Sequence, residues 1–259
     1  MKTIAFLVSG NIRIYEKNLI FLKNLKKILN NYEIIIISSV WKNQNEIEEF
    51  TRKYEIKYIN QIQEKNWENE IAKIKYVTGE ENLSWKIKNI FHMWHSIVEN
   101  KKFLETIIVK NNLKIDYVCR FRTDITTLEE IKYLQKDLEK IQNDEFLFSS
   151  NRHFRGITDL FFIAKYETFL KIKNIFVFFD KFSNEDRVFN PEYVFYCFIN
   201  ENNFKIKIAH KLDIAIIRIE NAKPTKIAHI PFKDKINMKI AKRKIKLIKI
   251  LNTLKYFWN

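Results

Sequence analysis

Short runs of consecutive apolar residues alternate along the chain with longer stretches in which apolar positions recur every three or four residues. Thr3–Val8 and Glu33–Ser38 are such runs, and they are typical of strands buried on both faces of a parallel sheet. Between them, apolar residues at helical spacing predict a helix up to about Asn30. A polar helix over 45–53 and a short strand over 57–60 follow. This alternation predicts an α/β fold: a mostly parallel, doubly wound sheet with helices on both faces and ligands at the carboxyl ends of its strands.

The pattern continues in the second half of the chain. A long helix is predicted over 84–110, and Pro191 is expected in the first turn of a later one, where proline is tolerated. The further predicted strands are 115–124, 145–150, 159–164, 204–208 and 214–219, and the further predicted helices are 166–180 and 191–200.

Length and charge suggest one large domain with a basic appendage. The chain has 259 residues and a net charge of +15. From residue 233 to residue 259 there are nine basic residues and one acidic residue. We therefore place the domain at 1–232 and a basic amphipathic C-terminal helix at 233–259. The rest of the chain is mildly basic, which suits a phosphate-bearing ligand without requiring nucleic acid.

Other features of the composition exclude several classes of protein. No uncharged apolar stretch reaches the ~18 residues of a membrane span, and no signal-peptide pattern is present, which predicts a cytoplasmic protein. Cys119 and Cys197 lie in apolar runs and are expected to be buried thiols. The three glycines are isolated, so a glycine-rich phosphate loop cannot form. Side chains and helix ends must hold any phosphate.

Charged side chains gather at the end of the strand predicted over 115–124. With a period of two, Arg120, Arg122 and Asp124 project to one side, and a buried strand tolerates this only if the charges are partnered. A carboxylate beside two guanidiniums could bind a divalent metal and a diphosphate. A purely structural ion-pair cluster is the equally plain alternative.

Three further positions are candidates for binding or catalysis. Gly10 and Arg13 follow the first strand, where a ligand crevice or only a turn would be expected. Glu192 stands at a predicted helix start and could be a general base or only a dipole contact. Asp159 opens a predicted strand and could bind an acceptor or cap a turn.

Two other patterns have a structural explanation as well. His92 and His95 are three apart on a helix, but no third ligand is evident, so a role at the edge of the core is preferred to metal binding. The tail 235–259 carries apolar residues near one helical face among lysines. Such a helix could lie on an anionic membrane surface or dock on the body of the protein.

The order of these motifs resembles a known family. The segments SGNIRIY, SSVW, DYVCRFRTDI, DLFFIAKYE and NPEYVFY occur in the progression found in WavE-like and related GT-A glycosyltransferases of bacterial lipopolysaccharide and capsule synthesis. The similarity runs from about Thr3 to Ile219, and the basic tail lies outside it. The resemblance implies a GT-A-like, Rossmann-type domain that uses a nucleotide-diphosphate sugar.

The resemblance also implies roles for individual residues. The metal motif Asp-x-Asp of the family falls on Arg122-Thr123-Asp124, so Asp124 would hold Mn²⁺ or Mg²⁺, while Arg122, which replaces the first Asp, can itself neutralise a diphosphate. Arg13, in the loop that matches the family's first loop, would contact the donor nucleotide or its phosphates. Gly10 and Arg120 are expected to contact the donor as well, from their own positions at strand ends. Asp159 and Glu192 match acidic positions near the acceptor, and Glu192 is the candidate base if the enzyme inverts.

These expectations combine into one function and one alternative. The function is transfer of a sugar to a glycan or lipid-linked acceptor of a surface polysaccharide, by a cytoplasmic protein or one peripheral on the cytoplasmic face of the inner membrane. No nucleic acid is expected as a partner. The alternative is a non-catalytic basic module that binds nucleic acid or an anionic membrane.

Overall fold

The computed structural model describes residues 1–9, 11–42, 46–74, 84–127, 130–149, 157–172, 175–176, 178–179, 189, 191–217 and 224–225, with the backbone alone at 84–86 and 224–225. These residues belong to one compact unit, Met1–Thr225. Gly10 and the predicted helix over 233–259 lie outside the described residues, so the domain boundary at residue 232 stays a prediction.

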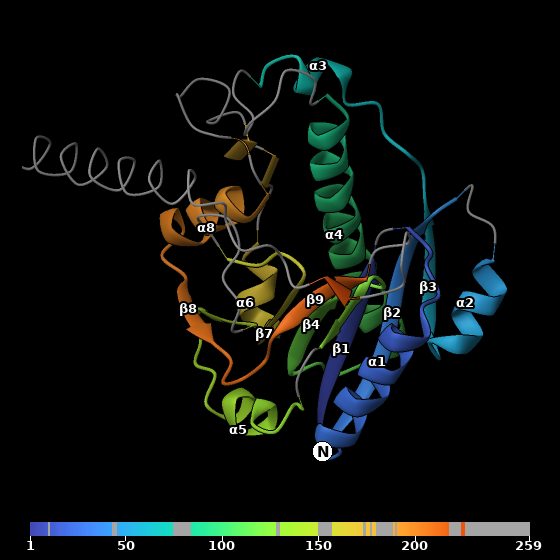
Figure 1. Ribbon diagram of the computed structural model, residues 1–259, viewed down its shortest axis with the longest axis vertical. Coiled ribbons are helices and arrows are strands. Elements are labelled where there is room, and N and C mark those ends of the chain that lie inside the picture. Colours follow the sequence, from blue (N-terminus) through green and yellow to red (C-terminus); the bar gives the residue numbers. More distant parts are fainter. Residues whose placement is uncertain are drawn as a thin grey trace, which may run out of the picture. The chain divides into compact units, whose positions relative to one another are not determined.

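A seven-stranded sheet forms the centre of this unit, in the order β3-β2-β1-β4-β7-β6-β8 (Figure 1). Strands β3, β2, β1 and β4 run parallel to one another, and β6 and β8 are parallel to each other. The mostly parallel sheet predicted from the apolar runs is therefore confirmed. The strands are β1 Lys2–Ser9, β2 Tyr32–Trp41, β3 Tyr58–Ile62, β4 Tyr117–Phe121, β6 Glu145–Phe148, β7 Phe161–Lys165 and β8 Lys205–Ile208.

Strand β7 runs antiparallel to both of its neighbours. Its first residue, Phe161, pairs with Phe121, the last residue of β4. Residues that precede β7 therefore lie at the same edge of the sheet as residues that follow β4. The predicted strand 159–164 begins two residues too early, because Asp159 lies in the bend that leads into β7.

The strand predicted over 115–124 is also shorter than expected. It ends at Phe121, and Thr123 and Asp124 form a turn. The chain then enters a separate three-stranded sheet of order β10-β9-β5. The alternation proposed for Arg120, Arg122 and Asp124 is thus wrong beyond Phe121, because a turn lets Arg122 and Asp124 bond to each other. The strands of this second sheet are β5 Ile125–Thr127, β9 Ile214–Ile217 and β10 Pro224–Thr225.

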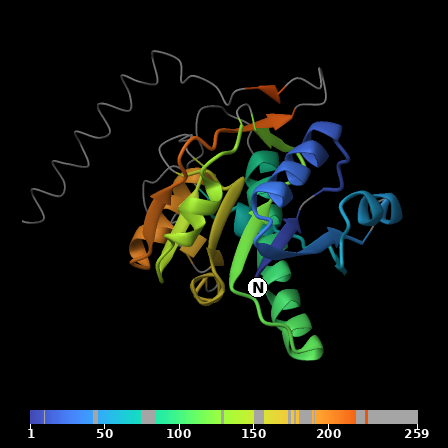
Figure 2. The same ribbon diagram turned by 90° about the horizontal axis from the view of Figure 1, so that it is seen from below.

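Helices cover both faces of the large sheet, as predicted, and Figure 2 shows α1 and α4 on opposite sides of it. On one face Phe21 of α1 packs against Phe121, with ring centres 5.5 Å apart. On the other face Trp94 of α4 lies in a large aromatic core and meets Phe195 at 4.9 Å. The helices are α1 Glu16–Ile28, α2 Ile47–Lys53, α3 Glu68–Ile71, α4 Ser84–Asn111, α5 Leu134–Glu139, α6 Tyr166–Leu170 and α8 Pro191–Glu201.

Smaller features of the described residues agree with the sequence in part. The helix predicted over 166–180 is interrupted, since α6 ends at Leu170. Pro191 opens α8 as expected. Cys119 and Cys197 are buried free thiols, which confirms the prediction for both. No described helix combines the length and the apolar character that crossing a membrane requires.

Candidate functional site

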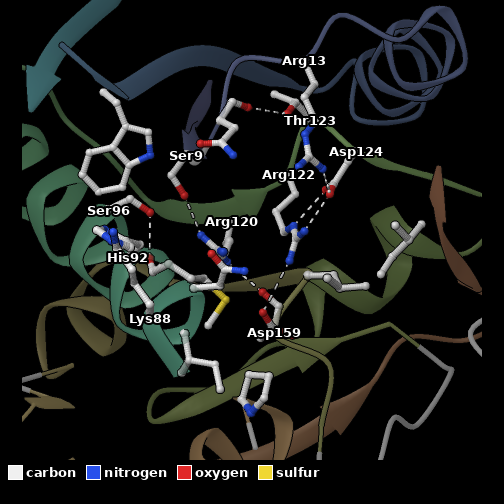
Figure 3. Close-up of a pocket in the computed structure, with 18 of the residues that line it drawn as sticks. Ser9, Arg13, Lys88, His92, Ser96, Arg120, Arg122, Thr123, Asp124 and Asp159 are labelled. Carbon is white, nitrogen blue, oxygen red and sulfur yellow. Dashed lines mark hydrogen bonds and ion pairs between the residues drawn. The ribbon is translucent and has the colours of Figure 1, made fainter. Parts of the chain in front are cut away.

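A cleft of about 780 Å³ opens at the carboxyl ends of β1, β2 and β4 (Figure 3). Such a location is the usual ligand site of an open α/β sheet. The cleft is large enough for a small-molecule ligand, for which pockets of about 300–1,000 Å³ are typical. Six of the residues selected from the sequence line it: Arg13, Arg120, Arg122, Asp124, Asp159 and Glu192.

Asp124 is the centre of an ion-pair network in this cleft. Arg122 donates to it twice, from Nε to Oδ1 at 2.9 Å and from Nη2 to Oδ2 at 2.7 Å. Arg13 donates from Nη1 to Oδ2 at 2.8 Å. The side chain of Asp124 is 5% exposed, whereas those of Arg13 and Arg122 are 36% and 26% exposed. One buried carboxylate thus orients two guanidiniums that reach the cleft.

The charges of this network determine how its members ionise. Burial by itself would raise the pKa of Asp124, but the charge and hydrogen bonds of Arg122, together with the charge of Arg13, outweigh it and leave the pKa below its ordinary value. Burial likewise opposes the charge of Arg122, and Asp124 overcomes that effect, so the pKa of Arg122 is raised. Asp124 is therefore an anion and Arg122 a cation at neutral pH.

Arg120 occupies a more buried position at the end of β4. The residue is only 3% exposed. Its Nε donates to the backbone carbonyl of Asp159 at 2.7 Å, and its Nη1 donates to Oγ of Ser9 at 2.6 Å. Burial lowers the pKa of Arg120 to about 10, so it still carries its charge at neutral pH. Both hydrogen-bond acceptors are neutral, which leaves its charge less compensated than that of Arg122.

Asp159 reaches the cleft because β7 is antiparallel to β4. Its Oδ2 lies 3.8 Å from Nη1 of Arg122, and its side chain is 4% exposed. The two acidic residues, Asp124 and Asp159, thus lie on either side of the Arg122 guanidinium (Figure 3).

A second layer of polar residues holds the turn that carries Arg122 and Asp124. Asn18 of α1 is fully buried and donates from Nδ2 to the carbonyl of Arg122 at 3.1 Å and to that of Ile125. The hydroxyl of Tyr54 donates to Oδ1 of Asn18 at 2.6 Å and lies 3.2 Å from the carbonyl of Arg13. Asn18 and Tyr54 therefore connect both sides of the arginine network.

Glu192 enters the cleft from the first turn of α8. There its carboxylate is favoured by the helix dipole. Its charge also contributes to the raised pKa of Arg122, so the two groups interact electrostatically. Both readings of Glu192 left open by the sequence, a dipole contact and a general base, remain compatible with this position.

The opposite wall consists of residues that were not selected as site residues from the sequence. Trp41, at the end of β2, is half-buried, and its ring meets those of His92 and His95 at 5.2 and 6.0 Å. Burial lowers the pKa of both histidines, so both are neutral at pH 7. Trp41 could have been selected because it ends the second strand. Nothing in the local sequence marks two further residues of this wall, Glu64 and Lys88, which pair at 3.2 Å.

The donor set does not fit a divalent cation at Asp124. Both of its oxygens already accept hydrogen bonds from guanidiniums. Like charges about 4 Å apart repel by roughly 4 kcal/mol near a protein surface, so Arg13 and Arg122 would oppose a cation there. Among the residues that the structure describes, no group of three or more His, Cys, Asp or Glu side chains is placed to hold a metal.

The charges that line the cleft balance. Four basic side chains face four acidic ones, so the overall charge of the cleft cannot attract a polyanion. The distribution is uneven, however. The wall formed by the three arginines contains only two aspartates. An anion bound here must therefore be held by directed N–H donors.

Comparisons with known proteins yield low similarities. No protein-family model matches the chain, and no curated protein matches it. A solved structure from Desulfovibrio desulfuricans G20, described as a nucleotide-diphospho-sugar transferase, is similar with a TM-score of 0.42 and 9% identity over 80% of each chain. A glycosyltransferase involved in glycosylation of the major capsid of PBCV-1 has a TM-score of 0.39 and 9% identity over 79% of this chain and 81% of its own. These values are low, so the function rests on the residues of the cleft.

Proposed function

We propose that this protein is a glycosyltransferase that moves a sugar from a nucleotide-diphosphate donor to an acceptor hydroxyl. The observation that supports this proposal is the grouping of Arg13, Arg120 and Arg122 at the carboxyl edge of a mostly parallel sheet, inside a cleft of about 780 Å³. Guanidiniums bind phosphate oxygens with matched, often bidentate geometry.

The chemistry follows from where charge develops. The bond between the anomeric carbon and the diphosphate oxygen breaks, and its electron pair goes to the diphosphate. Donors that interact more strongly with this growing negative charge than with the bound donor lower the barrier. The acceptor oxygen forms the new bond to the anomeric carbon and loses its proton. Glu192 is our candidate for the base in an inverting reaction, and Asp159 is our candidate for binding the acceptor.

The finer identity of the reaction comes from the family resemblance of the sequence motifs. We propose a glycan or lipid-linked acceptor of lipopolysaccharide or capsule synthesis, and a protein at the cytoplasmic face of the inner membrane. The basic tail 233–259 would attract it to the anionic lipid surface. The family motif would place Mn²⁺ or Mg²⁺ at Asp124, but both oxygens of this carboxylate accept hydrogen bonds from guanidiniums, so the proposed reaction includes no cation there.

The alternative is a non-catalytic basic module that binds nucleic acid or an anionic membrane. The charge excess of the tail favours this reading for the tail alone. The cleft favours it less, because its lining charges balance, whereas nucleic-acid sites carry a clear excess of basic side chains.

A donor screen tests the proposal. The full-length protein is incubated with UDP-, GDP-, dTDP- and ADP-sugars, and release of the nucleoside diphosphate is measured. We expect release from at least one donor, and a loss of about 10²-fold or more in Arg122→Lys, which keeps the charge but not the planar fork. The control is Arg52→Lys, the same substitution at an exposed arginine of α2.

Two outcomes would contradict the proposal. One is that no sugar nucleotide is turned over or bound, while RNA binds to the domain 1–232 with micromolar affinity. The other is that Arg122→Lys and Arg52→Lys turn over the donor equally well.

A further inference from the structure

We propose that the diphosphate of the donor is neutralised by Arg13, Arg120 and Arg122 directly, and that Asp124 is a positioning carboxylate for two of these arginines rather than a metal ligand. This inference rests on the proposed function, since it concerns how the same cleft holds the donor. It differs from the expectation drawn from the family motif, in which the same aspartate binds a divalent cation.

The first argument is that both oxygens of Asp124 already accept hydrogen bonds. Its two oxygens accept three hydrogen bonds, all at 2.7–2.9 Å, from Arg122 and Arg13. The carboxylate is 5% exposed, and the guanidinium of Arg122 lies between it and Asp159 (Figure 3). A metal ligand in an active site needs oxygens that face the substrate phosphates, and these oxygens face guanidiniums instead.

The second argument is the number of donors that remain. A guanidinium carries five N–H groups. Asp124 takes two from Arg122 and one from Arg13, and Asp159 lies 3.8 Å from Nη1 of Arg122. Both arginine side chains are partly exposed. Each therefore presents further N–H groups, which can bind phosphate oxygens while Asp124 keeps the fork oriented.

The third argument is preorganisation. A guanidinium on a flexible side chain must be ordered before it can stabilise a transition state, and a fixed carboxylate removes that requirement. Asp124 is itself fixed by the turn that Asn18 holds through the carbonyl of Arg122 at 3.1 Å. Arg120 is fixed independently, by Ser9 and the carbonyl of Asp159. The three oriented guanidiniums thus offer directed N–H donors to the diphosphate in place of a cation.

Binding measured with and without a cation tests the inference. Calorimetric titrations of the full-length protein use inorganic pyrophosphate and a panel of UDP, GDP, dTDP, ADP and CDP, once in excess EDTA and once in Mn²⁺ or Mg²⁺. We expect at least one nucleoside diphosphate to bind in EDTA with a Kd within about threefold of its value in the cation. Binding that requires the cation would overturn the inference and leave the proposed function standing. Absence of binding by every probe under both conditions would remove the proposed function, and the inference with it.

Variants of Asp124 supply an independent readout. Binding of Mn²⁺ in the presence of the nucleoside diphosphate is followed by electron paramagnetic resonance. We expect the same Mn²⁺ signal for the wild-type protein and for Asp124→Asn. In EDTA, the variant should bind the nucleotide at least about tenfold more weakly than the wild-type protein does. A protein-bound Mn²⁺ signal that disappears in Asp124→Asn would contradict the inference. Should that variant fail to fold, the titrations of the wild-type protein decide the question alone.

Discussion

Nη1 of Arg13 donates a hydrogen bond to Oδ2 of Asp124 at 2.8 Å, across 111 positions of sequence. The two residues meet because β1 and β4 are adjacent and parallel, so the loop after one strand lies beside the turn after the other. This contact joins the two segments that the sequence marked as separate candidates. It also makes one carboxylate responsible for the placement of two arginines.

Replacing this carboxylate should reduce stability. In Asp124→Asn the two guanidiniums lose their anionic partner but keep one carbonyl acceptor, so we expect a loss of about 1–3 kcal/mol in the free energy of unfolding. Urea denaturation of both proteins measures this loss of unfolding free energy. The control is Asp144→Asn, whose carboxylate is 42% exposed and pairs with Lys171 at 2.6 Å. A surface pair contributes about 0–1 kcal/mol, so equal losses in both variants would contradict the prediction.

The effect of the same substitution should depend on pH. The pKa of Asp124 is lower in the folded protein than its ordinary value of about 3.9, so its ion pairs stabilise the protein fully above that value. This stabilisation is lost as the pH falls through the folded-state pKa. The difference in unfolding free energy between the wild-type protein and Asp124→Asn should therefore be largest near neutral pH and shrink below about pH 4. A difference that stays constant from pH 7 to pH 3 would exclude a paired carboxylate.

Asn18 should be as important for the site as a residue in the cleft. In Asn18→Ala the carbonyls of Arg122 and Ile125 and the hydroxyl of Tyr54 lose their buried partner, which should cost about 2–4 kcal/mol. The affinity of the variant for the nucleotide should fall as well, because the turn after β4 is no longer held. Asn111→Ala removes a hydrogen bond to a backbone carbonyl at the exposed end of α4 and serves as the control. An unchanged affinity in Asn18→Ala would show that the turn is held by other contacts.

Glu192 is tested by its effect on turnover. If it takes the proton of the acceptor, Glu192→Gln should lower kcat by about 10²–10⁴-fold and change KM for the donor by less than about threefold. The acidic limb of the pH–rate profile should disappear as well. Glu201→Gln, at the other end of α8, is the matched control. Retention of both kcat and the acidic limb would assign the base to another group.

The basic tail gives a prediction that depends on the sequence alone. Deleting 233–259 removes nine basic residues and one acidic residue. Each basic residue near an anionic bilayer contributes about 1 kcal/mol, so the deletion should abolish sedimentation with phosphatidylserine vesicles. Turnover of a water-soluble acceptor should persist. Vesicles of phosphatidylcholine alone are the control. Equal sedimentation of both proteins would show that the tail is not the membrane contact.

Much of the sheet was predictable because the burial of a strand is visible in the apolar character of its own residues. A strand covered on both faces must be apolar throughout, so 3–8 and 33–38 were identified as β1 and β2 without any knowledge of their neighbours. Helix α4 was predicted almost to its last residue, since its apolar positions recur at helical spacing over many turns. Short helices such as α3 and α5 lack a comparable pattern and were missed.

The sequence predicted which residues belong to the candidate site, but not which of them contact one another. Arg120, Arg122 and Asp124 stood out because charges at the end of an apolar strand require partners. The sequence alone could not tell that Asp124 pairs with Arg13, or that Lys88 and Glu64 form the facing wall.

Local sequence determined which segments are apolar, which are helical and which charged residues stand at strand ends, because these properties depend on neighbours along the chain. Only the tertiary structure decided that β7 runs antiparallel, that Asp159 thereby lies beside Arg122, and that Asp124 bonds to two arginines. These relationships depend on strand order and register. Strand order and register are determined by packing of the whole core, and no single segment contains that information.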